Sequence, residues 1–95
     1  MPIFSFPDDA RWNERAEAVE FGVEVGEYRG VVRVARAVFR PLIGHAATPK
    51  TCLEAYHLAR SRFERAADDK LRRRALTSDG NVELTIRDLR GIKDV

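Results

Sequence analysis

An arginine lies on the apolar side of the longest helical pattern in this chain. Leu53, Tyr56, Phe63 and Ala67 share one helix face, because they recur at steps of three and four along the sequence. At about 100° per residue, Arg60 falls on the same face, roughly 30 to 50° from its centre. Its guanidinium must therefore reach solvent or pair with a carboxylate or backbone carbonyls from another segment. The pattern predicts one long amphipathic helix, with Arg60 as a buried structural arginine.

This helix has a recognisable start. Thr48 can cap the first turn with its hydroxyl, and Pro49 is favoured at the first helical position. The helical pattern continues to about residue 75, which corresponds to a length of about 40 Å. Strands of five to eight residues span only about 17 to 27 Å. The helix is therefore expected to extend past its sheet, which would leave Leu71 and Leu76 exposed in a monomer or buried against another chain in a dimer.

Alternation of apolar and polar residues predicts the strands. From residue 18 to residue 25, apolar side chains alternate with glutamate and glycine, as in a half-buried strand. Gly26 and Glu27 predict a tight hairpin, followed by a return strand over residues 28–34 and by Glu–Arg pairs across the solvent face. A short edge strand is expected at residues 3–6, and a last strand at residues 82–86.

The order of these elements predicts the fold class. Residues 35–43 have helical spacing but contain Pro41 and stop at Gly44, so we expect a short helix there. The predicted order is β-β-β-α-α-β, which indicates an α+β domain over residues 1–95. A small antiparallel sheet would pack one face on the long amphipathic helix.

The residues that could support chemistry are few and dispersed. The candidates for a metal site are His45, Cys52 and His57, and the last two lie about 140° apart on a helix. The same separation disfavours a Cys–His nucleophilic pair, and a small buried apolar role suits Cys52 better. We therefore expect no catalytic residue, metal site or cofactor, and no enzymatic activity.

A cluster of cations is the main candidate for a binding surface. Residues 29–76 hold twelve basic residues and four acidic ones, whereas residues 1–28 hold two basic residues and seven acidic ones. This asymmetry indicates complementary layers of one fold or a nucleic-acid surface. Cations at a helix C-terminus also have an ordinary structural role. The candidate contacts to nucleic acid or a partner are Arg62, Arg65, Lys70, Arg72, Arg73 and Arg74.

Composition indicates a cytoplasmic protein without a membrane span. The longest stretch without a charged residue runs from Pro41 to Pro49, which is too short to cross a bilayer. The first residues lack the basic and apolar regions of a signal peptide, and a single cysteine cannot form an internal disulfide.

Several residues together resemble one family of small bacterial proteins, the domain of unknown function family 1488. They are Phe6-Pro7, Trp12, Val19, Phe21, Gly26, Val34, Leu53, Tyr56, Arg60, Phe63, Ala66-Ala67 and Lys70. The chain departs from the family pattern at Ala35, where a serine or threonine would cap the short helix. The resemblance implies a bacterial, cytoplasmic α+β domain with no established activity, and it supplies no catalytic residues.

Function is therefore expected to lie in binding. The favoured interpretation is a non-enzymatic binding or regulatory module, with an unidentified protein or a second copy of the chain as its partner. The candidate surfaces are the sheet edge, the segment around Trp12 and the basic helix end, and Leu58 could add an apolar contact from the polar side of its helix. The alternative is a weak, sequence-indifferent nucleic-acid-binding protein that uses the basic helix end.

Overall fold

Four strands form one sheet in the computed structural model, which describes residues 3–44 and 46–90. They are β1 (Arg11–Asn13), β2 (Ala18–Val25), β3 (Tyr28–Ala35) and β4 (Val82–Leu84), and they lie in that order across the sheet. β1 with β2 and β2 with β3 are antiparallel, as predicted, but β4 runs parallel to β3. The sheet is therefore mixed, because the chain crosses the helical layer between β3 and β4 and returns to the same end of the sheet.

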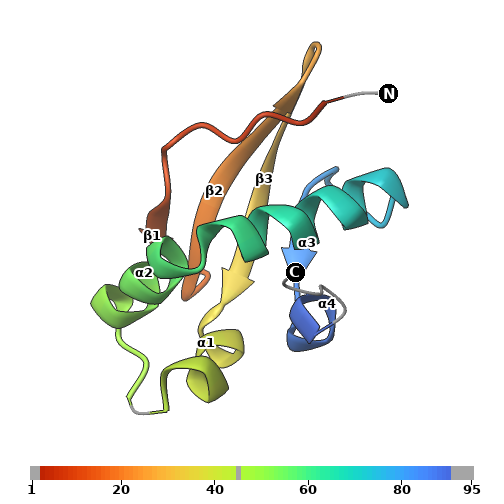
Figure 1. The fold of residues 1–95 in the computed structure, drawn as a ribbon. Coiled ribbons are helices and arrows are strands. Elements are labelled where there is room, and N and C mark those ends of the chain that lie inside the picture. Colours follow the sequence, from red (N-terminus) through yellow and green to blue (C-terminus); the bar gives the residue numbers. More distant parts are fainter. Residues whose placement is uncertain (1–2, 45, 91–95) are drawn as a thin grey trace.

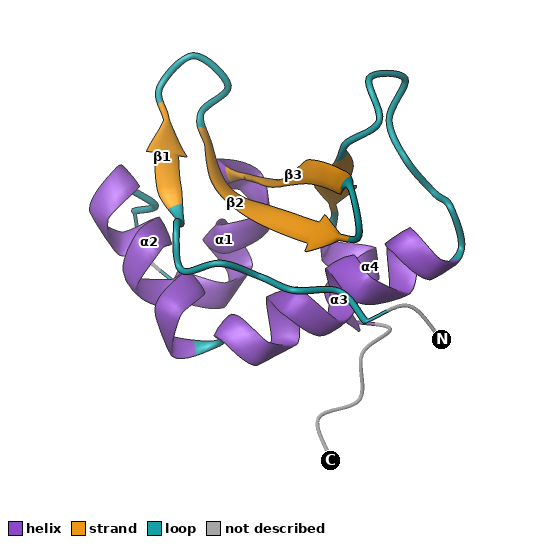
Figure 2. Cartoon of the chain, turned by 90° about the horizontal axis from the view of Figure 1, so that it is seen from above, coloured by secondary structure: helices purple, strands orange, loops and turns teal. Residues whose placement is uncertain are grey.

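The helices cover one face of this sheet, which confirms the α+β class (Figures 1 and 2). They are α1 (Arg36–Ile43), α2 (Pro49–Leu58), α3 (Arg60–Arg72) and α4 (Ile86–Arg90). The alternation in β2 follows this arrangement, because Val19, Phe21 and Val23 are fully buried under the helices. The other face of the sheet carries no helix, and we call it the open face.

Aromatic rings join the two layers. The Phe21 ring of β2 lies 4.9 Å from the Tyr56 ring of α2, and Tyr56 lies 5.6 Å from Phe63 of α3. Phe63 in turn lies 5.5 Å from Phe39 of α1. All four rings are almost completely buried. This chain of contacts fixes α1, α2 and α3 relative to the sheet.

The single long helix of the sequence prediction is divided at Ala59. This residue has φ −118° and ψ 27°, outside the helical region, and it ends α2 before α3 begins. α2 contacts β1 and β2, whereas α3 contacts β4 and α4. A straight helix could not follow both ends of a twisted sheet, and the bend lets each half pack on its own strands.

The helix also ends earlier than predicted. α3 ends at Arg72, and Leu71 is only 9% exposed, so the prediction of an exposed Leu71 is wrong. Leu76, which follows the helix, is 41% exposed, as expected. The predicted start is confirmed, because Thr48 and Thr51 form a reciprocal capping box at the first turn of α2.

The N-terminal edge of the sheet is interrupted. The expected strand at residues 3–6 is reduced to one bridge, in which Ser5 and Glu24 exchange two backbone hydrogen bonds of 2.8 Å. Pro7 then takes the chain away from the sheet, and pairing resumes only at β1. Between the two, the Gly22 amide donates to Asp9 Oδ1 at 2.9 Å. A side chain thus supplies the acceptor that a continuous strand would have provided.

The last predicted strand is also shorter, because Ile86 begins α4. The Thr85 amide donates to Asp88 Oδ2 at 2.7 Å, and the Asp88 amide donates to Thr85 Oγ1 at 3.3 Å. This reciprocal pairing caps the new helix. α1 starts at Arg36 without a side-chain cap from Ala35, and Gly44 ends it in a left-handed conformation at φ 76°.

Candidate functional site

Arg60 links the start of α3 to the N-terminal segment. Its Nε donates to Glu64 Oε2 at 2.6 Å, its Nη2 to the Phe6 carbonyl at 3.1 Å and its Nη1 to Asp8 Oδ1 at 3.3 Å. The hydrogen bond to Glu64 raises the pKa of Arg60 above the ordinary value of an arginine. The side chain is 33% exposed, so it is half-buried rather than buried, because the bend at Ala59 brings it to the rim of the helical layer. The interrupted edge strand frees the Phe6 carbonyl for this contact.

Lys70 covers the outer edge of β4. Its Nζ lies 2.9 Å from Asp88 Oδ2 and donates to the Glu83 carbonyl at 2.6 Å. The side chains of Lys70 and Asp88 are 17% and 12% exposed. Burial alone would raise the pKa of Asp88, but hydrogen bonds from Lys70 and Thr85 outweigh it and lower the pKa. Lys70 therefore protects a sheet edge, which reduces its availability to a partner.

Arg72 and Arg73 pair with acidic residues one helical turn earlier. Arg72 Nε lies 2.6 Å from Asp68 Oδ1, and Arg73 Nη2 lies 2.9 Å from Asp69 Oδ2. The Arg72 guanidinium also lies 5.3 Å from the centroid of the Phe4 ring. These two cations are thus partly neutralised within α3.

The six predicted cations do not form one surface. Arg62 Nη2 donates to the Leu89 carbonyl at 3.4 Å, so Arg62 and Lys70 both face α4. Arg65 lines a hollow of about 320 Å³ with Phe4 and Phe6, on the side of the N-terminal segment. Arg74 follows the helix in a left-handed conformation, at φ 56°. The structure brings the cations together in small groups on different sides of α3.

Trp12 is half-buried, although most of the segment around it is exposed. Trp12 packs against the core, and the Arg36 guanidinium lies 5.4 Å from the centroid of its ring. Arg36 is held there by Glu17, with Nη1 3.2 Å from Oε1. Arg36 therefore covers part of the Trp12 ring.

A row of alternating charges crosses the open face. Glu20 accepts from Nε and Nη2 of Arg33 at 2.8 Å, and Arg11 Nη2 lies 3.8 Å from its other oxygen. The Glu20 side chain is only 8% exposed between the two guanidiniums. The expected cross-strand pairs are therefore present, and Arg29 pairs with Glu24 at 4.0 Å in the same way.

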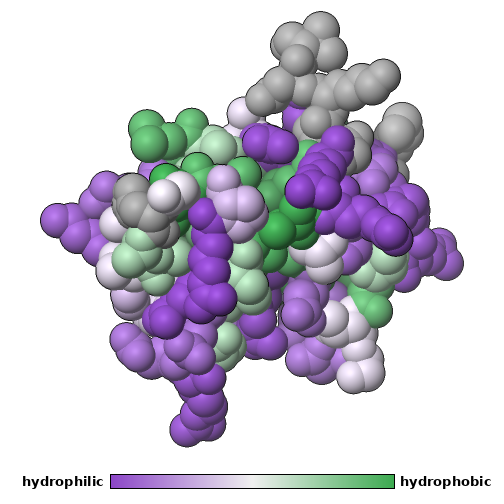
Figure 3. All heavy atoms as spheres, turned by 90° about the horizontal axis from the view of Figure 1, so that it is seen from below, coloured by the Kyte–Doolittle hydropathy of each residue, from purple (hydrophilic) through white to green (hydrophobic). Residues whose placement is uncertain are grey.

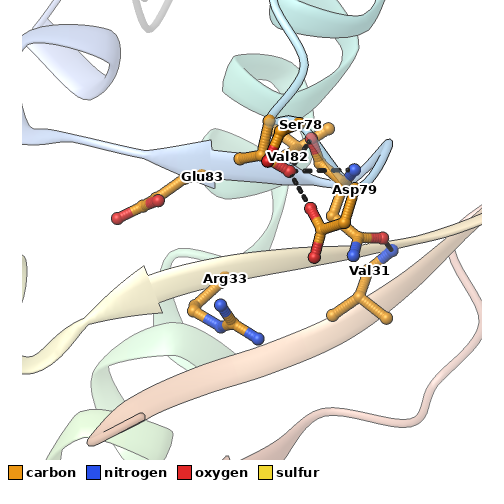
Figure 4. A pocket seen from close by; sticks show the side chains of 8 residues that line it. Val31, Arg33, Ser78, Asp79, Val82 and Glu83 are labelled. Carbon is orange, nitrogen blue, oxygen red and sulfur yellow. Dashed lines mark hydrogen bonds between the residues drawn. The ribbon is translucent and has the colours of Figure 1, made fainter.

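A polar hollow of about 190 Å³ lies beside Arg33, between β3 and the turn before β4 (Figure 4). The Val31 amide donates to Asn81 Oδ1 at 3.0 Å, and the Thr77 hydroxyl donates to Asp79. Hydrogen bonds from Thr77 and Asn81 lower the pKa of Asp79. Asn81 thus ties the turn to β3, and the Thr77-Asp79 hydrogen bond lies within the turn itself.

Cys52 and His57, the described candidates for metal binding or nucleophilic catalysis, lie in different environments. Cys52 is fully buried, and this burial raises the pKa of its thiol. His57 is exposed and stacks edge-on against Tyr56, with 5.2 Å between the rings. His45 lies outside the described residues. Within residues 3–44 and 46–90 there is no group of three or more His, Cys, Asp or Glu side chains that could hold a metal ion. In the same part of the chain, no helix is both long and apolar enough to cross a membrane.

Two hollows on the helical layer meet at Leu42 and form what we call the helix-face groove. The first, of about 210 Å³, lies between α1, α3 and α4, and the second, of about 230 Å³, lies between α1 and α2. The first is lined by Val38, Pro41, Leu42, Arg62, Ile86, Leu89 and Arg90. The second is lined by Leu42, Ile43, Thr51, Glu54, Ala55 and Leu58. Figure 3, from the side on which α1 and α4 lie in Figure 1, shows apolar residues exposed between charged ones.

The groove also gathers exposed hydrophobic side chains. Four large ones are exposed among the described residues, and two of them, Leu42 at 44% and Leu58 at 90%, line the second hollow. The other two, Ile3 and Leu76, lie elsewhere on the chain. Sequence reasoning identified Leu58 as exposed but missed the groove, because its walls come from separate segments.

Comparisons with known proteins identify relatives of this chain. A family model described as "Protein of unknown function (DUF1488)" matches residues 4–84. The fold is similar to the crystal structure of a protein of unknown function from the DUF1488 family of Shewanella loihica PV-4, with a TM-score of 0.79 at 15% identity. The similarity covers 85% of this chain and 90% of the other. No curated protein matches the chain.

Proposed function

Since the chain belongs to the DUF1488 family, whose description assigns no function, we propose from its own geometry that it is a non-enzymatic binding module. Its helix-face groove docks an apolar segment of a partner protein. The observation that carries this proposal is the pairing of Leu42 and Leu58 on one hollow. Exposed apolar side chains gathered on a groove are typical of interaction sites, whereas isolated ones are ordinary.

The division of the groove into two small hollows favours a protein over a small molecule. Each hollow alone, at about 210 or 230 Å³, is below the roughly 300 to 1,000 Å³ typical of pockets for drug-sized ligands. Two adjoining shallow hollows suit side chains that project from one segment of a partner, as in helix-in-groove recognition.

A second copy of the chain is a less suitable occupant. A two-fold dimer would place the same groove on both sides of the interface. Where the two-fold axis passes through the first hollow, Arg62 and Arg90 of one copy would approach those of the other, and repulsion between like charges would oppose the contact. We therefore favour a different protein as partner.

We also propose that the protein works in the bacterial cytoplasm. Its free, buried Cys52 suits a reducing compartment, and the structural neighbour named above comes from a bacterium.

Site-specific cross-linking tests the proposal. A photo-reactive residue at Leu58 should capture a protein partner, whereas the same residue at Ile3, which is 83% exposed, should not. With the purified partner, the double variant Leu42→Ser/Leu58→Ser should bind roughly ten- to a hundredfold more weakly, because apolar contact area is lost. The matched variant Ile3→Ser should bind normally, and equal binding by all three proteins would refute the proposal.

The two alternative functions, nucleic-acid binding and self-association, predict different results in binding and sedimentation experiments. A nucleic-acid-binding protein would bind oligonucleotides with an affinity that falls steeply with salt and with reversal of Arg72, Arg73 and Arg74, but not with Leu58→Ser. Self-association through the groove would appear as a dimer in sedimentation that Leu58→Ser dissociates. Either result would replace the protein-partner proposal.

A further inference from the structure

Two arginines border the first hollow of the helix-face groove. Arg62 on α3 and Arg90 on α4 both line it, beside an apolar floor that includes Val38 and Leu89. Val38 and Leu89 are 6% and 2% exposed, so the floor belongs to the hydrophobic core. The hollow therefore combines an apolar base with two guanidinium groups.

Neither arginine has a carboxylate partner among residues 3–44 and 46–90. Arg62 has one long hydrogen bond, at 3.4 Å, to the Leu89 carbonyl. Most arginines elsewhere on the chain lie within 4.0 Å of a carboxylate oxygen, namely Arg11, Arg29, Arg33, Arg36, Arg60, Arg72 and Arg73. Arg15 and Arg40 also have no such partner among the described residues, so the distinguishing feature of the first hollow is that it brings two of these cations together beside apolar side chains.

The apolar floor and the two arginines together favour one kind of partner segment. A guanidinium beside apolar surface forms strong, often bidentate hydrogen bonds with a carboxylate, because water competes less there. We propose, building on the docking function above, that the partner segment is acidic and amphipathic. It places an apolar side chain in the first hollow and an Asp or Glu side chain against Arg62 and Arg90.

Other occupants fit the lining less well. Among the described residues, no aromatic side chain lines the first hollow, so they offer no stacking platform for a nucleic-acid base. The second hollow does not match an acidic segment in the same way, because the described residues that line it include Glu54 and no arginine. A segment with its acidic residues at the α4 end is therefore preferred over a uniformly acidic one.

Selection from a displayed library of random 12-residue peptides tests this inference. Peptides retained by the full chain should carry Asp or Glu next to Leu, Ile or Phe. The same selection on Arg62→Glu/Arg90→Glu should lose this acidic preference. The control Arg15→Glu/Arg29→Glu, which changes the net charge equally on the sheet side, should keep it.

Direct titration of a retained peptide measures how much the two arginines contribute to its affinity. Its dissociation constant should rise about tenfold or more in Arg62→Glu/Arg90→Glu, and less in Arg90→Glu alone. Arg90 is exposed, so its single variant keeps the test valid if the double variant fails to fold.

The outcomes separate this inference from the function on which it rests. Peptides that depend on Leu42 and Leu58 but show no acidic preference would overturn the inference and leave the docking function standing. If no retained peptide depends on those leucines, the docking function fails as well.

Discussion

Gly30 leaves space on β3 for the side chain of Tyr28. Tyr28, two positions earlier on the same face of β3, lies across Gly30, and its hydroxyl donates to the Gly80 carbonyl at 2.9 Å. A Cβ on Gly30 would overlap the Tyr28 hydroxyl oxygen and lie 2.7 Å from Cζ. The missing side chain thus lets the ring tie the turn before β4 to the sheet.

We predict that Gly30→Ala lowers the free energy of unfolding by about 1 to 2 kcal/mol, because the ring must move and its hydrogen bond is lost. In a Tyr28→Ala background the same change should be neutral or stabilising, since alanine restricts the unfolded chain. Chemical denaturation of the four proteins gives this double-mutant cycle. Additive effects would show that the contact does not explain the glycine.

Arg60 shows what the sequence could predict at this scale. Helical periodicity placed it beside the apolar face and required partners from another segment, and the structure supplies Phe6 and Asp8. Its degree of burial was not predictable, because this depends on the bend at Ala59.

At the scale of elements, α4 is held to the sheet by a polar contact. Asp88 caps the first turn of α4 through Thr85 and also pairs with Lys70 of α3, which covers the edge of β4. Three elements therefore depend on one carboxylate. Leu89 of the same short helix supplies the apolar part of the contact, at 2% exposure.

We predict that Asp88→Asn destabilises the protein by about 1 to 3 kcal/mol near neutral pH, because Lys70 loses its charge partner. The folded-state pKa of Asp88 lies below the ordinary value of 3.8. Its contribution is therefore complete above about pH 5 and is lost as the pH falls through the folded-state pKa. Unfolding of both proteins across pH 2 to 7 should give curves that converge in acid, and a constant difference would contradict this account.

Local signals explain which elements were predictable. Alternation identified β2 and β3, and the Thr48-Pro49 pair identified the start of α2. The bend at Ala59 and the parallel pairing of β4 depend on how the helices cross a twisted sheet, which has no local signature. The cap formed by Thr85 and Asp88 was a readable signal for α4 that the strand-like alternation around it obscured.

At the scale of the whole molecule, the two faces differ in character. The open face holds charges that neutralise one another, such as Glu20 between Arg11 and Arg33. The helical face holds the groove, with Leu42 and Leu58 exposed and Arg62 and Arg90 without carboxylate partners in the described chain. The groove was not predictable from the sequence, because the residues that line it come from four helices that meet only in the fold.

The most direct test is a per-residue NMR titration of the labelled protein with its cross-linked partner or a retained peptide. We predict that the largest amide shift changes occur at Leu42, Leu58 and Arg90, while Glu20 and Arg33 on the open face stay unchanged. Changes centred on the open face or on residues 72–74, with the groove unaffected, would contradict the account.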